Sequence, residues 1–333
     1  MNAYEKPLSL GIDTSNYKTS VAVTDRNGVI IRDCRSFLYV KKGERGLRQS
    51  DALFQHVRIL PRLMEEALDD PSIRKNIGCV SASSRPRPVE GSYMPVFTAG
   101  VSAGEMIASS LGVPFYTFSH QEGHIEAASY YCGENPSRFV SFHFSGGTTE
   151  ALLVTRGETG ADFEIVGGSK DISFGQLLDR AGVSMGFDFP CGQVMDDLAC
   201  EACESLQKEA SGIFTPIKVK DGYVNLSGTE TQAMKVAGRF DSRIVSLGLL
   251  ATVASSIEKI TLQLAEKYEP EIFIFAGGVS SSRFIRQYLG KNKRQDIKLV
   301  FSDPGLASDN AVGTALLGGK KYGAETGNGN TAK

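Results

Sequence analysis

Two histidines lie four residues apart in the segment SHQEGHIEAA, at positions 120 and 124. The chain contains four histidines, and the other two are His56 and His143. On a helix, this spacing puts both imidazole rings on one face, within reach of a single metal ion. Glu122 lies between them but points to another face, so the segment is not the HExxH arrangement of zinc proteases. Two surface histidines that bind no metal are the alternative.

Asp309 is the candidate carboxylate ligand for the same ion. It follows an expected strand and loop, and it precedes the small-residue segment NAVGTALLGG, which is typical of a helix. Asp commonly caps the start of a helix, so capping is the alternative, and both roles can hold together. The histidine segment directly follows the expected strand VPFYTF. Ligands of open α/β sheets bind at the carboxyl ends of strands, which favours a site here.

Glycine-rich turns supply a second kind of chemistry, because their backbone N–H groups can approach a phosphate closely. Three turns qualify: GIDTSNYKTS, FSGGTTE and FAGGVSSSR. None matches a Walker loop or a GxGxxG fingerprint, and each alone is a weak signal. The segment MDDLACEAC carries Asp196 and Asp197, and the simplest interpretation of these acids is a solvated helix start.

Hydrophobic patterning predicts the elements that position these residues. A β-meander followed by alternating helices and strands occurs twice, with the second copy starting near residue 138. The first copy has expected strands at 8–13, 20–25, 29–34, 77–83 and 113–118 and helices at 51–68 and 100–110. The second has strands at 138–144, 150–155, 162–168, 271–278 and 297–303 and helices at 174–185, 194–210 and 243–268. The first helix would be capped by Ser50 or Asp51, and Pro61 predicts a kink or two helices in series.

The composition bounds the class of protein. The 333 residues are 41% apolar and 22% charged with a net charge of −2, which is typical of a globular protein. The basic run KKGERGLR, Lys41 to Arg48, is interpreted as a solvated loop. The six cysteines form no zinc-finger pairing, and no segment has the length of a signal peptide or a bilayer span. We therefore expect a cytoplasmic protein with no membrane association.

In order along the chain, these segments resemble the TsaD family over about residues 8 to 320. The resemblance implies an α/β fold of the actin/Hsp70/sugar-kinase type, with duplicated ribonuclease-H-like halves and a nucleotide cleft. One half would be residues 1–137 with about 305–322, the other 138–304, and residues 323–333 would form a disordered tail. The implied activity is transfer of a threonylcarbamoyl group from threonylcarbamoyl-AMP to adenosine of tRNA.

The family's H-x-E-G-H motif matches residues 120–124, and its DNA tripeptide matches residues 309–311. The resemblance therefore implies that His120, His124 and Asp309 bind one divalent ion. His143 stands where archaeal and eukaryotic members have a tyrosine near the metal. A third imidazole there would favour iron or zinc over magnesium, whereas a buried core histidine is the alternative.

The resemblance also implies a site for an adenine nucleotide, either ATP or an acyl-adenylate, with or without magnesium. The family's SGG-x-T loop, which holds the phosphate, matches residues 145–149. The family's ribose-contacting Asp matches Asp179, and its PGG glycine matches Gly192. Its GGV loop matches residues 277–279. The expected nucleotide contacts are Ser145, Gly146, Gly147, Thr148, Asp179, Gly192, Asp196, Gly277, Gly278 and Ser282.

The acceptor side departs from the family pattern. The family's first loop carries two acids that position or deprotonate the acceptor, and here Tyr17 and Lys18 stand in their place. Asp13 and Lys18 are the expected catalytic residues. The family's SGPGL segment is replaced by SSRPRPVEG. Arg85 and Arg87 would form a positive rim with Lys18 that meets tRNA phosphates or a small anionic acceptor, and a solvated loop is the alternative.

Three functions follow. The first is a metal-dependent acyl transferase that modifies tRNA. The second is a related carbamoyl or acyl transferase with a different small acceptor, which the change at Tyr17 and Lys18 motivates. The third is a non-catalytic ATP-binding partner protein. By resemblance, the chain would form a homodimer or a heterodimer with a scaffold paralogue.

Overall fold

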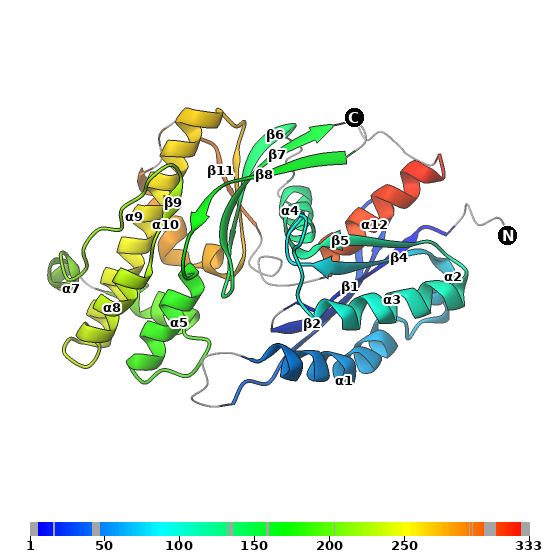
Figure 1. The fold of residues 1–333 in the computed structure, drawn as a ribbon, viewed down its shortest axis with the longest axis horizontal. Helices are drawn as coiled ribbons and strands as arrows, with labels where there is room; N and C mark the ends of the chain where they lie inside the picture. The colour runs from blue at the N-terminus through cyan, green and yellow to red at the C-terminus, as the bar shows by residue number, and fades with distance from the viewer. Residues whose placement is uncertain are drawn as a thin grey trace. The chain divides into compact units, whose positions relative to one another are not determined.

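A computed structural model of the chain describes residues 6–15, 17–41, 47–131, 133, 136–157, 160–202, 204–292, 294, 296–302 and 311–327. These residues belong to two compact units. The first unit takes in Met1–Val40, Gly46–Tyr131 and Asp309–Lys333, and the second takes in Lys41–Arg45 and Cys132–Ser308. Figure 1 shows the elements of each unit by colour along the chain.

The first unit is built on a five-stranded sheet with the order β3-β2-β1-β4-β5. The strands β1 (Leu8–Asp13), β2 (Lys18–Asp25) and β3 (Ile30–Phe37) form an antiparallel meander. The strands β4 (Ile77–Arg85) and β5 (Phe115–Ser119) add to β1 in parallel. The patterning that predicted these five strands is confirmed, with boundaries shifted by up to three residues.

Alternation along β1 assigns the two faces of this sheet. Leu10 and Ile12 are fully buried and share a core with apolar residues of α1 (Gln49–Ala67) and α3 (Phe97–Leu111). Ser9 and Gly11 face the opposite helix, α12 (Val312–Glu325), so closely that a Cβ on Gly11 would lie 2.5 Å from the carbonyl oxygen of Ala311. The helices α4 (His120–Tyr131) and α12 pack together on this second face (Figure 1). Asp13 continues the alternation of Ser9 and Gly11 and therefore lies on the α12 face.

Two expectations about the first helix are wrong: its side-chain cap and its division into two helices at Pro61. The residue before α1 is Arg48, and no side chain caps the helix, so neither Ser50 nor Asp51 has that role. The helix continues through Pro61 as a single element because its apolar stripe stays buried from end to end, so two helices in series do not form, and a kink at Pro61 stays a prediction. The short α2 (Pro71–Asn76) follows it.

The C-terminal helix is longer than expected. Helix α12 continues to Glu325, three residues into the tail that was predicted to be disordered, and residues 328–333 lie outside the described residues. The Glu325 carboxylate accepts a hydrogen bond of 2.5 Å from the Tyr116 hydroxyl on β5. This contact fixes the end of the helix on the sheet.

The second unit repeats the topology of the first. Its strands β6 (Arg138–Phe144), β7 (Thr149–Gly157) and β8 (Gly160–Ser169) form an antiparallel meander. The strands β10 (Phe273–Ala276) and β11 (Leu299–Phe301) add to β6 in parallel, and the short β9 (Tyr223–Val224) extends the other edge. The order β11-β10-β6-β7-β8-β9 therefore contains the order of the first sheet, which confirms the predicted duplication.

The helices of the second unit differ in part from the prediction. The helix expected over 194–210 is two helices, α6 (Gly192–Cys200) and α7 (Glu204–Ala210). The others are α5 (Phe174–Ser184), α8 (Ser227–Val236), α9 (Ser242–Tyr268) and α10 (Arg283–Asn292), with the 3-10 turn η2 (Gly278–Ser281) before α10. Helix α9 is long and apolar enough to cross a membrane, but 72% of its apolar window is buried as the core helix of this unit.

Candidate functional site

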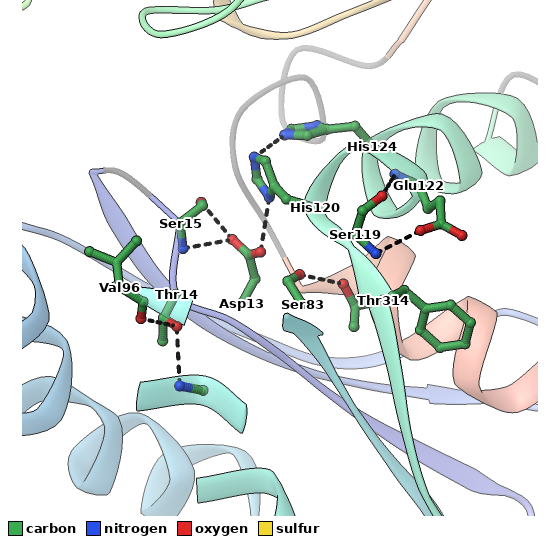
Figure 2. Close-up of polar contacts among 12 residues, drawn as sticks. Asp13, Thr14, Ser15, Ser83, Val96, Ser119, His120, Glu122, His124 and Thr314 are labelled. Carbon is green, nitrogen blue, oxygen red and sulfur yellow. Dashed lines mark hydrogen bonds and ion pairs between the residues drawn. The ribbon is translucent and has the colours of Figure 1, made fainter. Parts of the chain in front are cut away.

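The predicted histidine pair is present and converges. His120 and His124 are one helical turn apart on α4, and their Nε2 atoms lie 3.0 Å from each other (Figure 2). The ring centroids are 4.4 Å apart with an interplanar angle of 83°. His124 is 4% exposed, so the pair is set into the protein rather than displayed on its surface.

Asp13 orients the first histidine. Its Oδ1 atom lies 2.9 Å from Nδ1 of His120, and its other oxygen accepts a 2.7 Å hydrogen bond from the Ser15 hydroxyl (Figure 2). The Asp13 side chain is fully buried at the carboxyl end of β1. An Nδ1–H donated to a carboxylate directs the Nε2 lone pair of the same ring outward, which is the usual arrangement behind a metal-bound imidazole.

A capping box starts the helix that carries the pair. The Ser119 hydroxyl accepts from the backbone N–H of Glu122 at 3.2 Å, and the Glu122 carboxylate accepts from the backbone N–H of Ser119 at 2.7 Å. This reciprocal pairing satisfies N–H groups that the first helical turn leaves without partners. Glu122 therefore points away from the imidazoles, as predicted, and its role here is structural.

The position of the pair along the sheet depends on a close helix crossing. A Cβ on Gly313 of α12 would lie 1.7 Å from the carbonyl oxygen of Gly123 on α4. A Cβ on Gly123 would lie 3.0 Å from the Thr314 hydroxyl, which in turn lies 3.2 Å from the Ser83 hydroxyl on β4. Glycine at position 313 is thus required for α4 and α12 to approach this closely, and a side chain at position 123 would be tightly packed against Thr314. The glycine between the two histidines has a packing role.

The donor set fits a divalent transition-metal ion. With metal–nitrogen distances of about 2.1 Å, two nitrogens 3.0 Å apart subtend about 90° at the ion, which suits two adjacent ligands. Imidazole nitrogen ligands suit zinc and iron. Asp309, the predicted third ligand, lies outside the described residues, so its part in the site stays a prediction. His143 lies on β6 of the second unit and is 4% exposed, and its role as a further ligand also stays a prediction.

The three residues of the predicted basic rim each contact other groups, and their joint role stays a prediction. Lys18 begins β2, is 8% exposed, and its Nζ atom lies 4.4 Å from the centroid of the Phe37 ring. The Arg85 guanidinium lies 4.0 Å from the Glu122 carboxylate. Arg87 is exposed in the loop after β4, and its backbone N–H donates to the Ser92 hydroxyl. Arg85 and Arg87 lie at the carboxyl end of β4, and Lys18 begins the antiparallel β2 next to the carboxyl end of β1.

In the second unit, the predicted phosphate loop is a tight turn between β6 and β7. The Ser145 hydroxyl accepts from the backbone N–H of Gly147 at 3.4 Å and of Thr148 at 3.1 Å. The N-terminus of α5 packs against this turn, since a Cβ on Gly175 would lie 2.4 Å from the Ser145 carbonyl oxygen. Ser173 caps α5 and also donates to the Gly146 carbonyl at 2.8 Å. The partial positive charge of a helix N-terminus therefore lies directly behind the glycine turn.

The other predicted nucleotide residues have defined structural partners. Asp179 accepts from the backbone N–H of Cys191 at 2.8 Å, and burial raises the pKa of its carboxyl group. Gly277 has a φ of 89°, and a Cβ there would lie 2.4 Å from the Phe144 carbonyl oxygen, so this turn requires glycine. Gly192 and Gly278 have open space where a Cβ would stand.

Asp196 departs from the simple interpretation of a solvated helix start, which is wrong. It is 3% exposed, and its oxygens accept from the backbone N–H groups of Arg283 at 2.9 Å and Phe284 at 3.0 Å. The Ser282 hydroxyl also donates to the Asp196 carboxylate. The Ser282 hydroxyl oxygen in turn accepts from the N–H of Ile285 at 3.1 Å and so caps α10. Asp196 and Ser282 therefore hold the start of α10, directly after the GGV turn.

One structural contact of the second unit was not predicted. Asp171 accepts from the backbone N–H groups of Leu226 at 2.8 Å and Ser227 at 2.9 Å, at the start of α8. Burial alone would raise the pKa of this carboxyl group, but the hydrogen bonds from Leu226 and Ser227 hold it well below its usual value. No sequence signal indicates this contact, because the partners are 55 residues apart.

Comparison with known proteins decides the family. The family model described as TsaD, tRNA N6-adenosine threonylcarbamoyltransferase, matches residues 40–316. The chain belongs to the TsaD family. A Thermus thermophilus relative named tRNA N6-adenosine threonylcarbamoyltransferase is 26% identical, with 94% of this chain and 92% of the relative covered. A Methanothermobacter thermautotrophicus protein, named as a probable bifunctional tRNA threonylcarbamoyladenosine biosynthesis protein, is 27% identical over 95% of this chain and 56% of its own length.

Solved structures confirm the fold of this TsaD-family chain as the actin and sugar-kinase type. Component A of (R)-2-hydroxyglutaryl-CoA dehydratase from Acidaminococcus fermentans is similar with a TM-score of 0.57 and 14% identity, covering 95% of this chain and 98% of that one. Full-length HypF in a phosphate- and nucleotide-bound form has a TM-score of 0.57 and 12% identity, covering 95% of this chain and 56% of that one. The family is one of transferases.

Proposed function

We propose that this TsaD-family chain transfers a threonylcarbamoyl group from threonylcarbamoyl-AMP to an adenosine of tRNA. The family and the names of the relatives support tRNA modification. The observation that carries the finer proposal is the pair of Nε2 atoms 3.0 Å apart, with Asp13 hydrogen-bonded behind His120. Two buried imidazoles oriented in this way can hold a divalent ion beside the reacting groups.

The exocyclic amine of adenosine attacks the carbamoyl carbon, a C–N bond forms, and the C–O bond to the AMP phosphate breaks. AMP leaves with the electron pair, and the amine releases a proton. A bound iron or zinc ion would supply Lewis-acid stabilisation of the carbonyl oxygen. His120 and His124 would hold that ion, and Asp13 would hold His120 in the tautomer that leaves Nε2 available.

The second unit would hold the adenylate. We assign the AMP phosphate to the turn Ser145–Thr148 and to the N-terminus of α5 behind it, because helix N-termini favour anions. Asp179 would bind the ribose, and the turn at Gly277 and Gly278 would accommodate the adenosine. We further propose tRNA and the adenylate as the binding partners, in the cytoplasm. A homodimer or a heterodimer with a scaffold paralogue stays a prediction.

A different acceptor is the second candidate function, and Lys18 favours it. A cation stands where the family has an acid, and it is largely buried against Phe37. Lys18 cannot accept a proton from an amine while it is protonated, so the acceptor would have to lose its proton to another base. This observation fits a carbamoyl or acyl transferase whose acceptor is a small anion.

The test supplies the purified chain with threonine, bicarbonate, ATP, an enzyme that makes the adenylate, and bulk tRNA. Nucleosides from digested tRNA are then measured by mass spectrometry. We expect threonylcarbamoyladenosine to appear, and we expect His120→Ala to abolish it. Absence of the modified nucleoside with every tRNA tested, even with a scaffold paralogue added, would remove the proposal.

A further inference from the structure

Two aromatic rings are displayed at one edge of the first sheet. Phe37 and Tyr39 are each 70% exposed, more than any other large apolar side chain among the described residues. Phe37 ends β3, which is an edge strand. Leu38 between them is 5% exposed and its N–H donates to the Tyr17 carbonyl at 2.9 Å. The alternation of a strand therefore continues past Phe37, and both rings project from the same face.

A side chain of α1 holds the backbone of Tyr39 in place. The side-chain amide of Gln55 on α1 accepts from the N–H of Tyr39 at 2.7 Å and donates to its carbonyl at 3.1 Å. Both backbone groups of Tyr39 are therefore satisfied, as they would be by a neighbouring strand. A backbone that is already ordered loses little conformational entropy when a ligand binds.

Positive charge accompanies the rings. The Lys18 Nζ atom lies 4.4 Å from the Phe37 ring centroid, and Lys18 is the cross-strand partner of Phe37. Arg35 precedes Phe37 by two residues on the same strand, where its guanidinium forms an ion pair with the Asp33 carboxylate. Residues 35–48 contain five basic residues and one acidic residue, although the whole chain has a net charge of −2. The segment of the sequence that carries the rings is therefore basic, in contrast to the chain as a whole.

We infer that Phe37 and Tyr39, which we call the aromatic strip, bind single-stranded RNA by stacking on its bases while neighbouring cations contact its phosphates. This inference rests on the proposed function and adds the surface that recognises the RNA acceptor. Bases stack on exposed aromatic faces in a sequence-tolerant way, and strand-borne aromatics are a common platform for unpaired RNA. The excess of basic residues over residues 35–48 favours an anionic partner, because phosphates are bound by Lys and Arg side chains.

The test measures binding directly, using the full chain and fluorescence anisotropy. The probes are a fluorescein-labelled single-stranded oligoadenylate and a blunt RNA duplex. Stacking contributes about 1–3 kcal/mol per base, so Phe37→Ala and Tyr39→Ala should each weaken single-strand binding by about fivefold or more. Phe37→Tyr keeps the ring and should bind as the wild type does. Phe240→Ala, which removes a ring 46% exposed in the second unit, is the matched control.

Three outcomes contradict the inference: no binding of the wild type to the single strand, a double variant F37A/Y39A that binds within twofold of the wild type, or an equal loss for the duplex. A double variant that changes only the oligomeric state in sedimentation would assign the strip to a protein partner instead. The proposed function is judged separately. If the wild type modifies no tRNA but the alanine variants still lose RNA binding, only the catalytic proposal fails. If tRNA is modified and the strip does not affect binding, only this inference fails.

Discussion

Replacing Asp13 by asparagine tests the orientation of the metal-binding pair. The substitution keeps the size of a fully buried side chain but removes the charge that His120 contacts at 2.9 Å. The amide oxygen can still accept from Nδ1 of His120, and the Ser15 hydroxyl can accept from the amide nitrogen. The geometry is therefore retained while the charge-assisted hydrogen bond is lost.

A hydrogen bond to a charged group contributes about 1.5–3 kcal/mol, and each 1.4 kcal/mol is a factor of ten in affinity. Asp13→Asn should therefore weaken zinc binding by about 10- to 100-fold, the range found when partners of metal-bound histidines are replaced. Ser15→Ala removes only the 2.7 Å hydrogen bond to the other oxygen of Asp13. Its net loss of about 1 kcal/mol predicts a smaller change of about fivefold.

The assay is competition for zinc against a chromophoric chelator, which reports affinity without any need for catalysis. Asp51→Asn makes the same chemical change at an exposed position in the first turn of α1 and serves as the control. We expect the order of affinity to be wild type and D51N, then S15A, then D13N. The reasoning is refuted if D13N, folded as judged by its thermal transition, binds zinc as tightly as D51N.

Three further predictions concern the scaffold. Gly313→Ala would place a Cβ 1.7 Å from the Gly123 carbonyl oxygen and should destabilise the fold by about 3 kcal/mol in urea denaturation, whereas Gly290→Ala, with open space around its Cβ, should be neutral or slightly stabilising. The pKa of Asp171 in the folded protein is lower than its ordinary value of 3.8, so the unfolded state takes up the proton first as the pH falls. The stability of the fold should therefore decline as the pH drops below 3.8. Asp171→Asn should flatten this dependence and cost about 1 kcal/mol at neutral pH. A pH profile that is the same for both proteins would contradict this assignment. Burial raises the pKa of Cys34, Cys79 and Cys191 to about 11, so about 100-fold less thiolate is present at neutral pH than for an ordinary thiol, and mass spectrometry should find these three cysteines unmodified after brief iodoacetamide treatment of the native protein. Rapid labelling of any of them would show that its surroundings open more often than the fold indicates.

Local patterns predicted most of the fold because they reflect interactions between neighbours in sequence. The strands were found from runs of apolar residues, and the spacing of Ser119 and Glu122 matches a capping box. The convergence of His120 and His124 follows from helical periodicity alone. These features need no knowledge of the tertiary structure.

Contacts between distant residues account for what the sequence did not predict. Asp13 and His120 are 107 residues apart, so no spacing rule connects them, and the role of Asp13 as an orienting residue emerged only from the structure. Helix α8 was missed because Gly228 and its hydroxyl-bearing neighbours have low helix propensity, and because its start is held by Asp171, 55 residues away. Pro61 was expected to kink α1 or to divide it into two helices, and it does not divide it, because burial of the helix's apolar stripe outweighs the one hydrogen bond that proline removes.

The position of a bound metal ion tests the central claim most directly. Crystals of the protein loaded with zinc or iron would be measured above and below the absorption edge of the metal. The anomalous difference map should show one peak about 2.1 Å from the Nε2 atoms of both His120 and His124. A stoichiometrically bound ion located away from these two nitrogens would contradict the account.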